Sequence, residues 1–225
     1  MNKLLLTGIL SLIGFTTIWS QWTDHDLGSF IDFNAVTIHS NGDVFLSGDN
    51  GTLKVSIDCG NTWEDVTLDF DDDIGAIQFV NENLGFMVAD DGYFAKTEDG
   101  GASWAFGSTP APDNLQALHF LNSQVGYMVG RDGAIVKTTD GGNSWALQVS
   151  GSTNRLEAVH FFDEEHGIVT GRDNTLLYTE DGGASWANMN ATTSGDLKGI
   201  TFYGENGIIA GEGSVYIISP TLDVI

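Results

Sequence analysis

The amino-acid sequence predicts an all-β fold built from one repeated unit, and three observations carry this prediction. Tryptophans recur at Trp22, Trp63, Trp104, Trp145 and Trp186, each 41 residues after the one before. Glycine is abundant at 29 residues and proline occurs only 3 times, while no stretch keeps the three-and-four apolar spacing of a helix. A repeat of about 40 residues holding four short strands is typical of a β-propeller blade.

The first residues have the pattern of a targeting segment. Asn2 and Lys3 give a short positive start, residues 4–18 form an apolar run, and Ser20 offers a small residue for cleavage before Gln21. The run is too short for a comfortable membrane span. We therefore expect residues 1–20 to be a signal peptide and residues 21–225 a single propeller domain in the periplasm or outside the cell, with an uncleaved anchor as the alternative.

Each repeat is expected to supply four antiparallel strands, and the third repeat shows them most clearly. They are predicted at 117–121, 126–130, 134–137 and 146–149, with the turn 131–133 between the second and third. The fifth repeat stops after its third strand, and Trp22 stands at the start of the mature chain without three strands before it. We therefore predict that Gln21–Leu27 completes the last blade and closes a ring of five four-stranded blades, which would remove the exposed sheet edges.

A turn motif, S/T-x-D-x-G-x-S/T-W, separates the third and fourth strands of the first four repeats. Its Asp can accept backbone N–H bonds of its own turn, its glycine can take a positive φ, and its Trp can anchor the turn on the sheet. A structural role suits four copies at a fixed period better than a catalytic or calcium-binding one. The residues concerned are Asp58, Asp99, Asp140 and Asp181, with Trp63, Trp104, Trp145 and Trp186.

This motif resembles the Asp box (BNR-like repeat), and the whole repeat resembles the photosystem II stability and assembly factor family, whose propellers typically have seven blades. Sialidases and sortilin-type receptors are more distantly similar. The resemblance implies a non-enzymatic propeller that holds a protein or peptide partner. A sialidase-like Asp-box glycoside hydrolase is the alternative, but the early Arg-Ile-Pro segment of those enzymes is missing, and we assign no catalytic residue.

Composition narrows the classes of partner. The chain carries 31 acidic against 8 basic residues, a formal net charge of −23, so its field repels nucleic acid and anionic membranes. A lone cysteine, Cys59, excludes an internal disulfide and the usual cysteine clusters for zinc. No cofactor is expected, with calcium as the alternative; peripheral membrane association and the oligomeric state are left open.

The three arginines of the chain are the candidate binding residues. Arg131 and Arg172 occupy the same turn of neighbouring repeats, and Arg155 lies in the connection that enters the second of these repeats. In a propeller these loops emerge on one face and the Asp boxes on the other. Scattered solvated charge is the plainer interpretation of this trio, and the sharper hypothesis is that it binds a carboxylate-bearing partner or peptide.

Two further groups are weighed as metal sites. The corresponding loops of the first two repeats are acidic, and we interpret them as a solvated surface rather than a calcium site. His119 and His160 are 41 residues apart on predicted inner strands, where they are interpreted as a polar lining because two ligands are too few. The acidic residues are Asp49, Asp69, Asp71, Asp72, Asp73, Asp90 and Asp91.

Overall fold

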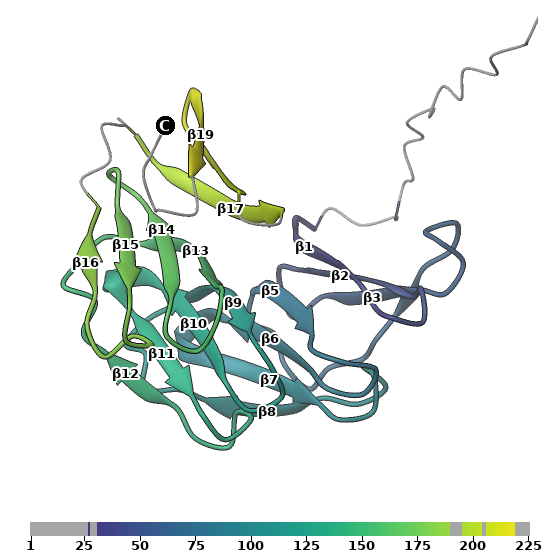
Figure 1. Ribbon diagram of the computed structural model, residues 1–225. Coiled ribbons are helices and arrows are strands. Elements are labelled where there is room, and N and C mark those ends of the chain that lie inside the picture. Colours follow the sequence, from purple (N-terminus) through teal and green to yellow (C-terminus); the bar gives the residue numbers. More distant parts are fainter. Residues whose placement is uncertain (1–26, 28–30, 190–194, 204–205, 219–225) are drawn as a thin grey trace, which may run out of the picture.

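The computed structural model describes residues 27, 31–189, 195–203 and 206–218. These residues form five antiparallel sheets that follow one another around an arc, so the predicted all-β propeller with five blades is confirmed (Figure 1). In the described part of the chain, no helix is long and apolar enough to cross a membrane.

The strands have the following bounds. Blade 1 contains β1 (Phe33–Ile38), β2 (Val44–Gly48), β3 (Leu53–Ser56) and β4 (Glu64–Asp65). Blade 2 contains β5 (Ile74–Phe79), β6 (Gly85–Ala89), β7 (Tyr93–Thr97) and β8 (Ala105–Ser108). Blade 3 contains β9 (Leu115–Phe120), β10 (Gly126–Gly130), β11 (Ile135–Thr138) and β12 (Ala146–Gln148). Blade 4 contains β13 (Leu156–Phe161), β14 (Gly167–Gly171), β15 (Leu176–Thr179) and β16 (Ala187–Asn188). Blade 5 contains β17 (Leu197–Tyr203), β18 (Asn206–Gly211) and β19 (Ser214–Ile218), and the short 3-10 turns η1 (Asp90–Gly92) and η2 (Arg131–Gly133) follow β6 and β10.

Within each blade the strands pair in chain order. The first strands lie innermost, because β1 packs on β5, β5 on β9, β9 on β13 and β13 on β17. Four strands are present in blades 1 to 4, as predicted, whereas the described residues of blade 5 form three. The predicted fourth strand, Gln21–Leu27 with Trp22, lies outside the described residues except for Leu27.

The apolar residues form four cores, each between two successive blades. Aromatic rings meet face to face at two of these interfaces. Phe86 of blade 2 stacks on Phe120 of blade 3 with ring centroids 3.8 Å apart, and Tyr127 of blade 3 stacks on Phe161 of blade 4 at 3.6 Å. A blade therefore buries its apolar faces against its neighbours, which is why the unit must be repeated to be stable.

Blades 1 and 5 each have one face that no neighbouring blade covers in the described residues. Ile38 in β1 takes the place that Phe120 and Phe161 have in their blades, yet it is 72% exposed. Ile208 in β18 takes the place of Tyr127, which is fully buried, and is 46% exposed. In the described residues, blades 1 and 5 therefore do not cover each other as the inner blades do.

Candidate functional site

The Asp boxes are closed hydrogen-bonded turns between the third and fourth strands. In blade 3, Asp140 Oδ1 accepts the Ser144 N–H at 2.9 Å and the Thr138 hydroxyl at 2.8 Å, while Oδ2 accepts the Ser144 hydroxyl at 2.6 Å. These bonds, that of the Ser144 hydroxyl first, lower the pKa of Asp140 to about 2. Asp58, Asp99 and Asp181 have the same pattern of partners. Each carboxylate is thus engaged inside its own turn.

The box tryptophans pack on the inner strands. Trp145 meets Phe120 edge to face, with centroids 5.9 Å apart, and Trp104 and Trp186 make the matching contacts with Phe79 and Phe161. The indole N–H of these three is buried and has no acceptor among the described residues, whereas Trp63 Nε1 donates to the Gly60 carbonyl at 3.1 Å. Packing rather than hydrogen bonding is therefore what Trp104, Trp145 and Trp186 contribute.

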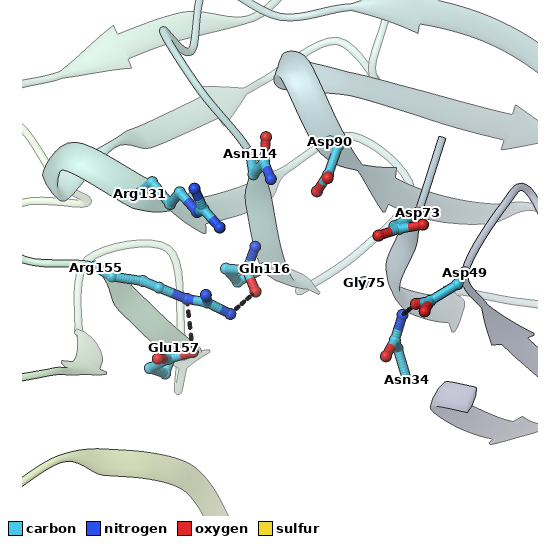
Figure 2. A pocket seen from close by; sticks show the side chains of 10 residues that line it. All are labelled: Asn34, Asp49, Asp73, Gly75, Asp90, Asn114, Gln116, Arg131, Arg155 and Glu157. Carbon is cyan, nitrogen blue, oxygen red and sulfur yellow. Dashed lines mark hydrogen bonds and ion pairs between the residues drawn. The ribbon is translucent and has the colours of Figure 1, made fainter. Parts of the chain in front are cut away.

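On the opposite, loop-bearing face, every first strand carries a β-bulge at the same point of the repeat. The pairing register shifts there by one residue in all five blades. The residue left unpaired is Asn34, Gly75, Gln116, Glu157 and Lys198 in successive blades, again 41 residues apart. A bulge re-aims the side chain it carries. Figure 2 shows Asn34, Gln116 and Glu157 around the mouth of a shared cavity.

This mouth cavity has a volume of about 390 Å³ and is lined by polar side chains from blades 1 to 4. Carboxylates of Asp49, Asp73 and Asp90 lie on one side, and the guanidinium groups of Arg131 and Arg155 lie on the other (Figure 2). The sequence placed all of these residues on one face, but it did not reveal that they share a cavity.

The three candidate arginines differ in their hydrogen-bond partners. Arg155 Nε donates to Glu157 Oε2 at 3.2 Å and Arg172 Nε donates to Glu157 Oε1 at 2.9 Å, so one carboxylate bridges both. The same carboxylate raises the pKa of Arg172 further above its usual range. Arg155 also contacts the amide oxygen of Gln116 and lines the mouth cavity, whereas Arg172 does not.

Arg131 is the least engaged of the trio. Its side chain is 48% exposed, and its nearest carboxylate, Asp113, lies 4.0 Å from Nη1. An ion pair at that distance and exposure is weak. The guanidinium of Arg131 is therefore the most accessible positive group at the mouth.

The acidic residues also differ from one another. Asp49 accepts a hydrogen bond from the Asn34 amide at 3.0 Å, and Asp73 accepts one from the Asn50 N–H at 2.9 Å. The Asp90 carboxylate accepts none within the described residues. Burial and then the neighbouring Asp73 raise the pKa of Asp90, although Arg131 acts in the opposite direction.

The other acidic candidates lie off the cavity wall. Burial and then Asp71 raise the pKa of Asp72, and the Asp91 N–H donates to the Asn114 amide oxygen at 3.0 Å. Asp69, Asp71, Asp72 and Asp91 do not line the mouth cavity. Across residues 31–189 and the described parts of blade 5, no three His, Cys, Asp or Glu side chains are grouped to hold a metal ion.

His119 and His160 do meet, with ring centroids 4.7 Å apart, and Phe202 stacks on His160. Burial first, and then His160, lower the pKa of His119 to about 4, while burial lowers that of His160. The Phe161 backbone hydrogen-bonds the His119 ring, as the Phe120 backbone does the Gln78 amide one blade earlier. This repeat position therefore links the inner strands of successive blades.

Sequence comparison places the chain in a family. Residues 60–158 and 146–221 match the family described as photosynthesis system II assembly factor YCF48. The chain belongs to this YCF48 family. No curated protein sequence matches it.

Solved structures agree with the fold. A structure titled "YCF48 bound to D1 peptide" is 23% identical, with a TM-score of 0.68, covering 85% of this chain and 64% of that one. YCF48 from Cyanidioschyzon merolae is 19% identical with a TM-score of 0.69, covering 88% and 70%. An ancestral GH74 enzyme is 15% identical with a TM-score of 0.67, covering 86% of this chain and 30% of the enzyme. The chain thus spans 64% of the length of the first of these YCF48 structures.

Proposed function

We propose that this member of the YCF48 family is an exported, non-enzymatic assembly factor that holds a protein or peptide partner on its loop face. Family membership is the observation that carries the proposal, since the family is described as an assembly factor. The related structure with a bound D1 peptide supports a polypeptide as the kind of partner.

The loop face is the better location because its charged groups are open to a ligand. The Asp-box carboxylates accept hydrogen bonds from within their own turns, as Asp140 does from Ser144 and Thr138. Arg131 keeps most of its bonding capacity, and Arg155 lies beside it at the cavity. Arginine forks bind carboxylates in a bidentate manner, so we propose that Arg131, Arg155 and Arg172 contact a carboxylate-bearing partner.

Binding of the D1 peptide by the mature chain tests this proposal, together with capture of partners from the envelope fraction of the source cells. We expect the Arg131, Arg155 and Arg172 triple Ala variant to lose binding and Lys96→Ala, a charge loss on the Asp-box side, to keep it. Unchanged binding by the triple variant would contradict the arginine site. Turnover of a glycan panel would favour the hydrolase alternative instead.

Export is a second part of the proposal. The positive start at Asn2 and Lys3, the apolar run and Ser20 support removal of residues 1–20. Expression of the full chain in a secretion-competent host, followed by mass spectrometry, should find a mature protein that begins at Gln21 outside the cytoplasm. Intact chains retaining Met1 in the cytoplasm would contradict it.

We also propose that Gln21–Leu27 pairs with β19 and completes blade 5. Trp22 lies 41 residues before Trp63, and β19 pairs only with β18 in the described residues, whereas β3, β7, β11 and β15 each pair with a fourth strand. Amide exchange should then be slow along both edges of β19, and Trp22→Ala should accelerate it there but not in β15. Fast exchange in the unmutated protein would contradict closure by this segment.

A further inference from the structure

On the loop face, each blade brings together two residues that flank its bulge, and in four of the five blades both residues are charged. The residue after the second strand donates its backbone N–H to the carbonyl of the residue two before the bulge. These bonds run from Asp49 to Asp32, Asp90 to Asp73, Arg131 to Asn114, Arg172 to Arg155 and Glu212 to Asp196, with N–O distances of 2.8–3.2 Å. In blades 1, 2, 4 and 5 the bond brings together two side chains of like charge, which is unfavourable unless another group compensates.

The bulge residue is that compensating group in three of these four blades. Asn34 donates to Asp49 at 3.0 Å in blade 1, and Lys198 lies 3.5 Å from Glu212 in blade 5. In blade 4 Glu157 bridges both arginines and is only 14% exposed. The repeat therefore pairs a like-charged couple with a side chain of complementary chemistry on the bulge.

Blade 2 is the exception, because its bulge residue is Gly75. The bulge therefore supplies no hydrogen-bond donor or positive charge to Asp73 and Asp90. The Asp90 carboxylate has no hydrogen-bond donor among the described residues. The raised pKa of Asp90 is consistent with this deficit. Gly75 lines the mouth cavity together with these two aspartates.

The positive wall of the cavity does not fill this deficit. Arg131 makes its only ion pair within 4.0 Å to Asp113, and Arg155 to Glu157, so in the part of the chain described neither arginine pairs with Asp90 or Asp73. The mouth cavity, about 390 Å³ in volume, thus has the accessible guanidinium of Arg131 on one side. On the other side lie Asp73, whose carboxylate accepts only the Asn50 N–H, and Asp90, whose carboxylate has no donor among the described residues. That volume suits one or two amino-acid side chains rather than a folded domain.

We propose that the mouth cavity binds a polypeptide segment that carries both charges: a lysine or arginine side chain that takes the place of the missing bulge residue between Asp73 and Asp90, and a nearby carboxylate that pairs with Arg131. This inference rests on the proposed function and adds the chemistry that the partner must have. A purely anionic ligand would face three carboxylates, and a purely cationic one would face Arg131. A segment of mixed charge satisfies both walls.

Three capped seven-residue peptides test the inference: one with an aspartate and a lysine two residues apart, one with the lysine replaced by glutamine, and one with the aspartate replaced by asparagine. We call the first the mixed peptide, the second the acidic peptide and the third the basic peptide. At low salt we expect the mixed peptide to bind the mature chain at least tenfold more tightly than the acidic or the basic peptide, and we expect this difference in affinity to shrink as salt rises. Titration calorimetry or fluorescence anisotropy measures it.

Variants assign the two walls. Asp90→Asn should abolish the preference for the mixed peptide over the acidic peptide and leave binding of the acidic peptide unchanged. Arg131→Gln should abolish the preference for the mixed peptide over the basic peptide and leave binding of the basic peptide unchanged. Gly75→Lys supplies the missing group from the chain itself, as Lys198 does in blade 5, and should also remove the preference. Its Cβ would lie 3.2 Å from the Leu115 carbonyl oxygen, so its fold is checked by thermal melting. Glu180→Gln, an equal charge change on an Asp-box turn, should change nothing.

The outcomes separate the inference from the function it rests on. If the acidic peptide binds through Arg131 and the mixed peptide binds no better, or if Asp90→Asn keeps the preference, the mixed-charge subsite is overturned and the proposed function stands. If neither these peptides nor the D1 peptide binds, both are overturned.

Discussion

The two faces of this propeller share one backbone repeat but use it in opposite ways. On the Asp-box face the same residue types recur in four blades, and their polar groups satisfy one another within each turn, as Asp140, Thr138 and Ser144 do. On the loop face the equivalent positions change from Asp49 and Asp90 to Arg131 and Arg172, and several charges are left facing solvent. Repetition thus marks what holds the blades together, and variation marks where a partner can be distinguished.

The largest expected effect is on the Asp-box face. Gly141 has φ +69°, and an added Cβ would lie 2.8 Å from the Ser123 carbonyl oxygen. Gly141→Ala should therefore lower the free energy of unfolding by about 2–4 kcal/mol, from strain plus overpacking. Gly151 in the loop face has φ +73° but open space around it, so Gly151→Ala should cost only about 1 kcal/mol. Equal losses in denaturant melts would break the comparison.

A buried hydroxyl on the same face should come next. The Thr138 side chain is 1% exposed and its oxygen accepts the buried Gly142 N–H at 2.9 Å. Thr138→Val leaves that donor without a partner and should cost about 1–3 kcal/mol. Thr153 is exposed on the loop face, and Thr153→Val should stay within about 0.5 kcal/mol. Chemical denaturation of both variants measures the difference, and a neutral Thr138→Val would show that the box tolerates the unmet donor.

The buried histidine pair should make the stability of the inner strands depend on pH. Burial lowers the pKa of His119 to about 4, so the unfolded chain binds protons below about pH 6.5 while the folded chain does not. Stability should fall as pH drops from about 6.5 toward 4, by on the order of 1–3 kcal/mol, and His119→Gln should flatten that slope.

His166 is the matched control for this slope. The Asp163 carboxylate raises its pKa, so what it contributes is present at low pH and lost as pH rises. His166→Gln should therefore leave the decline between pH 6.5 and 4 in place. If stability melts across this range show the same slope with and without His119, the buried pair is not its cause.

The smallest stability effect should come from the loop face. Arg131 is half exposed and 4.0 Å from its nearest carboxylate, so Arg131→Ala should change the free energy of unfolding by less than about 0.5 kcal/mol. It should also raise the pKa of Asp90, because Arg131 is the positive group that opposes the rise. Carbon-detected NMR titration of the Asp90 carboxyl measures this, and a fall in that pKa would contradict the placement of the two side chains.

The tryptophan spacing and the Asp boxes allowed the blades to be predicted, because both are fixed by residue types that recur. The β-bulges could not be predicted in this way, since Asn34, Gly75, Gln116 and Glu157 share no chemistry and the bulge is a property of strand pairing. The sequence placed three arginines on one face. It did not reveal that Glu157 bridges two of them, a contact that depends on where the bulge aims that side chain.

The recurrent bulge has a consequence for how such a protein changes over time. Because the unpaired residue contributes to no sheet register and to no inter-blade core, the side chains at Asn34, Gln116 and Glu157 can be exchanged without repacking the blades that carry them. Four of the five such positions line one cavity, and each is encoded by a single codon at a fixed interval. Duplication of a blade followed by drift at these few codons is then enough to give an existing propeller a new specificity, and the same positions are the natural choice for redesigning it.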